Sequence, residues 1–294
     1  MILVPVWTFY LLGAWHGGRL SSAPLPRGTF LAGLVSFTAL LGAIYILNQI
    51  TDRETDRKGG KLFLLSHSII SSRAAALEAA LLVSLAIAIG ILFMPIAFNI
   101  VLLLGLLLGL AYSVEPVRLK RRPGLDVLAN AAGNGVLNTL AGWTAVGAPL
   151  EGLSVLAPYP LAVASVHLTT TLADMEGDSA CGLRTSGVAL GPRKGIALAV
   201  ALMAAAVAAA SAVHNRPAFY ASLLSIPIFL LPARSSKREN FASSVLLPAK
   251  AATLIFSVTA GFLFPLYIPA LAFVVLGTRL YYRNRFGMVY PGLR

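Results

Sequence analysis

Charged residues are scarce in this sequence: they make up 12% of its 294 residues, whereas 57% are hydrophobic, and the mean hydropathy is +0.81. Soluble globular proteins carry about 25% charged residues. Several stretches of about 18 residues or more contain almost no charge, and a helix of that length crosses a bilayer core about 30 Å thick. The alternating pattern of a membrane β-barrel is missing. We therefore expect an all-α, polytopic membrane protein.

Other common features are also missing. The single cysteine, Cys181, excludes an intrachain disulfide. There is no glycine-rich P-loop, so a nucleoside triphosphate is not indicated. The N-terminus lacks the basic residues and cleavage site of a signal peptide, which favours a short first helix. Without internal repeats or low-complexity segments, residues 1–294 are expected to form a single integral-membrane domain.

Hydrophobic segments predict where the chain crosses the membrane. The expected spans are residues 2–16, 29–50, 75–94, 96–114, 125–146, 154–173, 194–213, 217–233, 243–264 and 266–283. Only Pro265 separates the last two segments, so the prediction is nine or ten transmembrane helices.

Basic residues are distributed unevenly between the predicted loops. Nineteen of the 23 Lys and Arg residues lie in loops after even-numbered segments or at the C-terminal end, whereas the odd-numbered loops hold Arg19, Arg27 and Arg216. The positive-inside rule then places the N-terminus, the even-numbered loops and the tail in the cytoplasm, and favours ten spans. Topology and contact with anionic lipid account for the net charge of +12, so no nucleic-acid partner is expected.

Aspartate is rare, and its positions are informative. Four of the five aspartates form two D-x-x-x-D pairs, Asp52 with Asp56 and Asp174 with Asp178, at the predicted cytoplasmic ends of the second and sixth segments. Residues four apart share one helix face, and Asn48 adds a further turn to the first pair. Mg²⁺ is usually held by one or two carboxylates together with substrate phosphates. One such pair fits a solvated helix cap equally well, but two pairs on the same membrane face favour a metal site.

Cationic residues follow each acidic pair. Arg118, Lys120 and Arg184 lie in predicted cytoplasmic loops, where they are placed to bind diphosphate oxygens. For any one of them taken alone, a role as a topology signal is the better explanation. On pattern alone, Tyr112 fits an interfacial tyrosine, and His167 fits a structural histidine bonded to a neighbouring helix.

The fifth predicted span carries polar residues at every fourth position. These are Asp126, Asn130, Asn134 and Asn138. Polar side chains inside a membrane helix either bond to neighbouring helices or line a wet cavity. Both interpretations stay open, and the second one makes Asn134 a candidate substrate-binding residue.

Three stretches resemble a known family. "NQITDRETD" resembles the first Asp motif of the UbiA superfamily of intramembrane prenyltransferases, and "DMEGDSACGLRTSGVALG" resembles the second. Between them, "AYSVEPVRLKRRPGLDVLANAAGNGVLN" is similar to the family's Tyr-Ser…Lys segment and the helix after it. The three motifs occur in the family's order, up to residue 195.

The resemblance implies a helical fold around a central cavity, with both Asp motifs at its cytoplasmic mouth, in the cell membrane. It implies Mg²⁺-dependent transfer of an isoprenyl group from an isoprenyl diphosphate donor to a lipophilic or aromatic acceptor. Residue by residue, it implies that Mg²⁺ and the diphosphate are bound by Asn48, Asp52, Asp56, Asp174 and Asp178. Lys120 and Arg184 would bind diphosphate oxygens, and Tyr112 would lie near the reacting carbon.

The sequence departs from the family pattern in several places. No Arg-Pro precedes the first segment, so either a further segment precedes "MILVPVW" or another cation takes its role. Gln49 stands where many members have aspartate, and "RKGGKLFLLS" lacks the usual proline-rich turn.

The sequence fits two other functions less well. The continuous Asp-rich motif of CDP-alcohol phosphotransferases does not occur here, and the paired repeats of many transporters are not evident. The resemblance leaves the acceptor and the donor chain length open.

Overall fold

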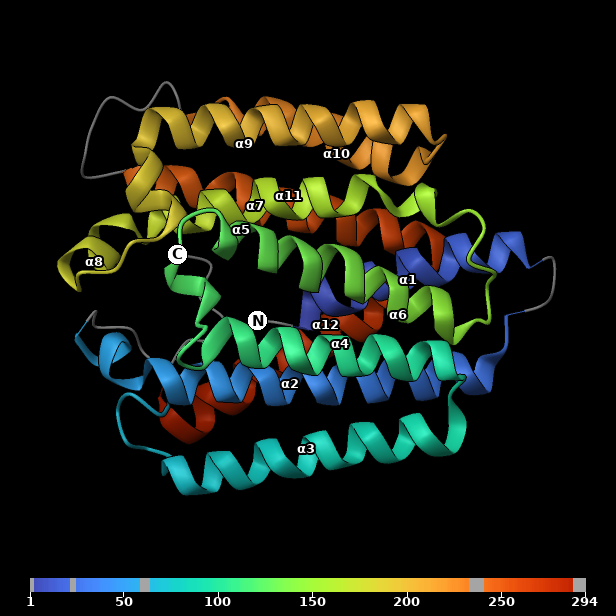
Figure 1. The fold of residues 1–294 in the computed structure, drawn as a ribbon, viewed down its shortest axis with the longest axis horizontal. Helices are drawn as coiled ribbons and strands as arrows, with labels where there is room; N and C mark the ends of the chain where they lie inside the picture. Colours follow the sequence, from blue (N-terminus) through green and yellow to red (C-terminus); the bar gives the residue numbers. More distant parts are fainter. Residues whose placement is uncertain (1–2, 22–24, 59–63, 233–240, 288–294) are drawn as a thin grey trace.

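Long helices lie side by side along one axis of the molecule (Figure 1). The computed structural model describes residues 3–21, 25–58, 64–232 and 241–287, and these ranges contain no β-strand. The predicted all-α fold is therefore confirmed.

Each predicted hydrophobic segment coincides with helical structure. The long elements are α1 (Leu3–Leu20), α2 (Arg27–Lys58), α3 (Ser72–Phe93), α4 (Ile96–Ser113), α7 (Pro158–Ala173), α9 (Ser186–Ala212), α10 (Arg216–Phe229), α11 (Phe241–Leu263) and α12 (Tyr267–Phe286). The fifth segment is a series of α5 (Leu125–Asn130), the π-helical turn η2 (Ala131–Leu137) and α6 (Asn138–Ala145). The remaining short elements are the 3₁₀ helices η1 (Leu119–Arg121) and η3 (Leu153–Leu156), and α8 (Met175–Ala180).

Among the described residues, six helical stretches are long and apolar enough to cross a membrane. They are Arg27–Arg57, Ser72–Phe93, Ile96–Ser113, Leu153–Ala173, Ser186–Ala212 and Phe241–Leu263. Pro265 lies in the turn between α11 and α12, which are separate helices. The total of nine or ten crossings stays a prediction.

Helix α9 begins earlier than expected, at Ser186 rather than at residue 194. The sequence conceals this start because Gly191 interrupts the helix with a left-handed φ of 69°, directly before Pro192. The part of α9 before Gly191 directly follows Thr185, whose hydroxyl donates to Asp178 of the second Asp motif.

Small residues allow the central helices to approach each other closely. A Cβ atom on Gly13 of α1 would collide with the Thr139 carbonyl oxygen, and one on Gly142 of α6 would collide with that of Tyr10. Backbones in contact gain van der Waals packing where lipid provides no hydrophobic driving force. The crossing of α1 and α6 therefore depends on glycine at both positions.

The outer surface is strongly apolar. Leu81, Ile91, Phe262 and Phe273 are each more than 60% exposed. Monomeric soluble proteins rarely expose contiguous apolar surface on this scale, whereas lipid-facing helices do. The fold is that of a multi-pass membrane protein.

Candidate active site

The first Asp motif occupies the last turns of α2. Asn48, Asp52 and Asp56 follow one another at four-residue spacing on this helix, as predicted. The Lys120 ammonium group, on η1, donates hydrogen bonds of 2.7 Å both to Asn48 Oδ1 and to Asp52 Oδ2. Asp56 is buried. One lysine thus connects the first two positions of the motif.

Arg118 supplies a second cation to the same carboxylate. Its Nη2 donates to Asp52 Oδ1 at 3.3 Å and to the Thr51 carbonyl oxygen at 3.1 Å. The backbone at Arg118 is left-handed, with a φ of 37°, which turns the chain back toward α2. The side chains of Arg118 and Lys120 are each only 11% exposed, and that of Asp52 is 20% exposed. Asp52 therefore lies between two largely buried cations.

The environment of Lys120 also affects its proton affinity. Burial lowers the pKa of the Lys120 ammonium group, and the adjacent Asp52 carboxylate opposes this shift. Arg118 and Arg121 lower the pKa further. Lys120 thus depends on a nearby anion to keep its charge favourable in this position.

The second Asp motif is held more loosely. Asp174 is the residue between α7 and α8, and its carbonyl oxygen accepts a 2.9 Å hydrogen bond from the Asp178 backbone N–H. The Thr185 hydroxyl donates to Asp178 Oδ2 at 3.0 Å. Asp174 is exposed and Asp178 is partly buried. The backbone at Gly182, with a φ of 70°, makes the turn that leads back to α9.

The two motifs lie at the same end of the bundle. Figure 1 shows α8 and the C-terminal end of α2 together at this end, next to the chain that follows α4. The charges of Asp52 and Asp178 both act on the Tyr112 hydroxyl group, at the end of α4. Residues far apart in the sequence thus approach one another around Tyr112.

The carboxylates do not form a ready-made metal cage. In the described part of the chain, no group of three or more His, Cys, Asp or Glu side chains is arranged to hold a metal ion. Each motif instead offers a pair of carboxylates, with Asn48 as a further oxygen donor. Such a set suits Mg²⁺, which usually takes its remaining ligands from water and substrate phosphates.

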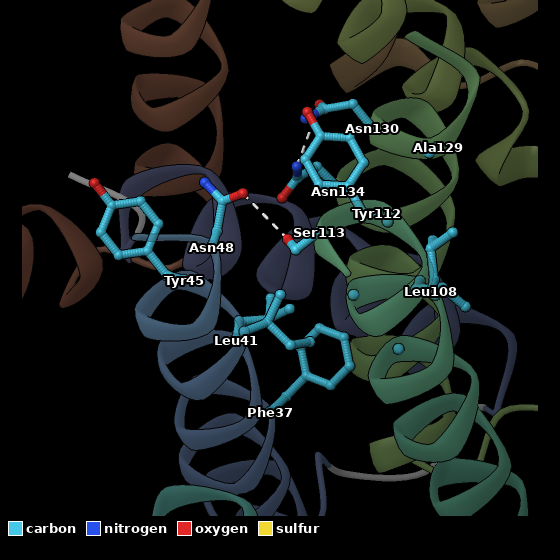
Figure 2. Close-up of a pocket in the computed structure, with 15 residues that line it drawn as sticks. Phe37, Leu41, Tyr45, Asn48, Leu108, Tyr112, Ser113, Ala129, Asn130 and Asn134 are labelled. Carbon is cyan, nitrogen blue, oxygen red and sulfur yellow. Dashed lines mark hydrogen bonds between the residues drawn. The ribbon is translucent and has the colours of Figure 1, made fainter. Parts of the chain in front are cut away.

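A cavity of about 270 Å³ lies directly beside the first motif (Figure 2). Its polar end is formed by Asn48, Tyr112, Ser113, Asn130 and Asn134. The rest of its wall is largely apolar and includes Phe37, Leu41 and Leu108. The Ser113 hydroxyl donates to Asn48 Oδ1 at 3.1 Å, which joins the cavity to the motif. The cavity therefore combines a polar end with an apolar interior.

The polar stripe of the fifth span divides into three roles. Asn130 and Asn134 line the cavity, and Asn134 Nδ2 donates to Asn130 Oδ1 at 3.2 Å. Asn138 is fully buried among the packed helices. Asp126 does not reach the cavity: its carboxylate accepts from the Ser186 backbone N–H at 2.7 Å and from the Ser186 hydroxyl. Of the two interpretations left open by the sequence, interhelical bonding therefore applies to Asp126, which caps the N-terminus of α9, and cavity lining applies to Asn130 and Asn134.

The predicted site residues are brought together unequally. Asn48, Asp52, Arg118 and Lys120 contact one another, and Tyr112 and Asn134 line the adjoining cavity. In contrast, Arg184 is exposed in the loop after α8 and makes no ion pair with other described residues.

Thr51 and Ser113 also belong to this group of contacts, although no motif in the sequence singles them out. The Thr51 hydroxyl accepts a 3.2 Å hydrogen bond from Lys120, and Ser113 contacts Asn48. Both are direct sequence neighbours of predicted residues, which is the only signal that points to them.

These features define a helical membrane protein with an acidic and cationic site above an apolar cavity. Residues 3–245 match the profile of the UbiA prenyltransferase family, and the chain belongs to that family. The CDP-alcohol and transporter hypotheses are set aside by this assignment.

The sequence is similar to those of several other proteins. It is 30% identical over 194 residues to the bacteriochlorophyll synthase 34 kDa chain of Chloroflexus aurantiacus. The aligned region covers 64% of this protein and 60% of that relative. The sequence is 27% identical over 234 residues to the lycopene elongase/hydratase of Halobacterium salinarum, which covers 78% of this chain and 80% of that protein.

Solved structures share the fold. A UbiA homolog from Archaeoglobus fulgidus, bound to GPP and Mg²⁺, aligns with a TM-score of 0.66 at 23% identity over 88% of this chain and 96% of the other. A UbiA homolog from Aeropyrum pernix K1 aligns with a TM-score of 0.67 at 22% identity over 86% and 95%.

Proposed function

We propose that this protein transfers an isoprenyl group from its diphosphate to a lipophilic or aromatic acceptor inside the membrane and releases diphosphate. The observation that carries this proposal is the position of Asn48 and Asp52, held by Lys120 and placed at the polar end of an apolar cavity. The names of the relatives and the GPP and Mg²⁺ bound by the Archaeoglobus homolog support it.

The acidic motifs would hold Mg²⁺ together with the diphosphate. The proposed ligands are Asn48, Asp52, Asp56, Asp174 and Asp178. All of them offer oxygen, the donor that Mg²⁺ prefers. When bound, Mg²⁺ neutralises charge that develops on the leaving diphosphate.

The cations would bind the diphosphate oxygens. Lys120 and Arg118, which contact Asp52 in this structure, have N–H groups close to where a diphosphate would bind. Arg184 would approach from the loop after α8. Fixed cations in a site that excludes water stabilise a leaving diphosphate more strongly than they would in solution.

The central cavity would hold the prenyl chain. Burial in its apolar part is worth about 0.8 kcal/mol for each CH₂ group. Tyr112 and Asn134, at its polar end, would then lie near the reacting carbon. The helical walls would keep water away from the carbon that loses the diphosphate.

We also propose that the site faces the cytoplasm. The basic loops that contain Lys120 and Arg184 belong to the set that the positive-inside rule assigns to that side.

The decisive experiment measures pyrophosphate release by the purified protein in lipid, with geranylgeranyl diphosphate and a pooled set of acceptors. We expect release that depends on acceptor and Mg²⁺ and stops when EDTA is added. Asp52→Ala and Asp174→Ala should each abolish release, because each removes a proposed Mg²⁺ ligand.

Glu54→Ala provides the matched control. Glu54 lies between the two aspartates of the first motif but is exposed, so its removal should leave release unchanged. Full activity in Asp52→Ala or Asp174→Ala, with correct folding shown by gel filtration, would refute the proposed function.

A further inference from the structure

A second cavity, of about 180 Å³, adjoins the first. It is enclosed by side chains of α1, α7 and α11, and it shares Asn130 and Asn134 with the central cavity. The central cavity is otherwise lined from α2, α4 and the fifth helical segment. The two hydrogen-bonded asparagines therefore separate two spaces that approach them from opposite groups of helices.

The second cavity has no charged side chain, among the described residues, that could pair with a charged ligand. None of the described residues that line it is charged. The hydroxyl groups of Thr8, Thr170 and Thr253 are already hydrogen-bonded within the protein. An anion placed here would be buried without a cationic partner, which is strongly unfavourable.

One polar atom in this wall lacks a partner. Nε2 of His167 is buried and makes no hydrogen bond, and it is the one such side-chain atom among the described residues of the cavity. An unpaired buried polar atom costs free energy, so a ligand that pairs with it gains that free energy on binding.

The surroundings of His167 indicate what this atom can bind. The Thr170 hydroxyl donates to the His167 carbonyl oxygen at 2.7 Å, so only its lone pairs face His167 Nδ1, at 3.5 Å. This arrangement favours the tautomer with the proton on Nδ1. Nε2 is then a hydrogen-bond acceptor, and its complement is a hydroxyl group.

The position of His167 fits the second substrate of a transfer reaction. His167 lies on α7, seven residues before Asp174, which directly follows this helix, and the charges of Asp126 and Asp174 act on the His167 ring. The cavity therefore adjoins the polar end of the proposed donor site without including the acidic motifs.

Building on the proposed function, we propose that the second cavity binds the acceptor, and that the acceptor is an uncharged, largely apolar alcohol or phenol whose hydroxyl donates to His167 Nε2. The two substrates would meet at Asn130 and Asn134. The volume of the cavity suits the hydroxyl-bearing end of such a molecule.

The test uses the full-length protein in lipid with geranylgeranyl diphosphate and Mg²⁺. Acceptors are offered as matched sets of alcohol, carboxylic acid and phosphate monoester on benzene, C20 isoprenoid and glycerol-ether skeletons. We expect at least one alcohol or phenol to stimulate pyrophosphate release, and the anionic members of its set to stimulate it at least tenfold less.

Variants of His167 test the hydrogen bond. His167→Phe should raise the acceptor KM by about threefold to tenfold, the range expected for one hydrogen bond, with the donor KM within twofold. His167→Gln, which can present an amide oxygen near the position of Nε2, should recover part of this loss. Thr259→Val is the matched control, because Thr259 lies outside both cavities and its hydroxyl bonds to its own helix, and its acceptor KM should not change.

Binding of labelled geranylgeranyl diphosphate is measured separately. Three outcomes would overturn the acceptor inference while Mg²⁺-dependent donor binding is intact. An acid or a phosphate could be the preferred acceptor, or no alcohol or phenol could stimulate release. The third outcome is an unchanged acceptor KM in His167→Phe. If wild-type protein binds no donor, the proposed function itself fails.

Discussion

The two acidic motifs have the same spacing but very different surroundings. In the first motif, Asp52 is largely buried and held by Lys120 and Arg118. In the second, Asp174 is exposed, and Arg184, in the loop after α8, is exposed as well. The first half of the proposed site is thus held by buried ion pairs without a substrate, and we expect the more exposed second half to depend more on bound ligands for its order.

The largest expected effect is on kcat/KM, when Lys120, beside the first motif, or Arg184, in the loop after the second, is replaced by a neutral residue. Lys120→Gln should lower kcat/KM about 10²- to 10³-fold, because a preorganised charge near the leaving group is lost. Arg184→Gln should lower it only about tenfold, since an exposed side chain has to be ordered first. Steady-state pyrophosphate release measures both values. Equal losses would mean that the two halves contribute alike and that the contrast in burial has no functional meaning.

The next effect concerns stability without substrate. Asp52→Asn should lower the free energy of unfolding by about 2 kcal/mol, because Lys120 loses its carboxylate partner and Arg118 keeps, among the described residues, only the exposed Glu115 as an ion-pair partner. Asp174→Asn should change it by less than about 0.5 kcal/mol, as is usual for exposed positions. Thermal unfolding of both variants in the same detergent provides the comparison. A larger loss in Asp174→Asn would contradict the assignment of the first motif as the more tightly held half.

The smallest effect concerns the hydroxyl that holds the second motif. Thr185→Val removes the 3.0 Å hydrogen bond to Asp178 and should raise the Mg²⁺ concentration for half-maximal activity by about threefold to tenfold. Thr51→Val is the matched variant at the first motif. Lys120 also donates to Asn48 and Asp52, so the Mg²⁺ concentration for half-maximal activity should rise less in Thr51→Val than in Thr185→Val. The reverse order would show that the second motif is not the one that depends on local support.

The periodicity of the sequence is sufficient to predict the helices and the arrangement of the first motif. Asn48, Asp52 and Asp56 lie on one helix, so their common face follows from the spacing alone. The sequence left the role of Asp126 open because its partner, Ser186, is 60 residues away on another helix. The same limit applies to the second cavity, whose wall combines side chains from four parts of the chain. His167 becomes informative only when the neighbours of its Nε2 are known.

The lysine that connects Asn48 and Asp52 has a consequence for the order of binding. Free Mg²⁺ would have to compete with two resident cations for the Asp52 carboxylate. A Mg²⁺–diphosphate complex would instead bring anionic oxygens of its own, to which Lys120 and Arg118 could donate, and would leave the Asp52 carboxylate available as the proposed metal ligand. The exchange of partners leaves no charge unpaired, so the protein should select the metal already attached to its substrate over the bare ion.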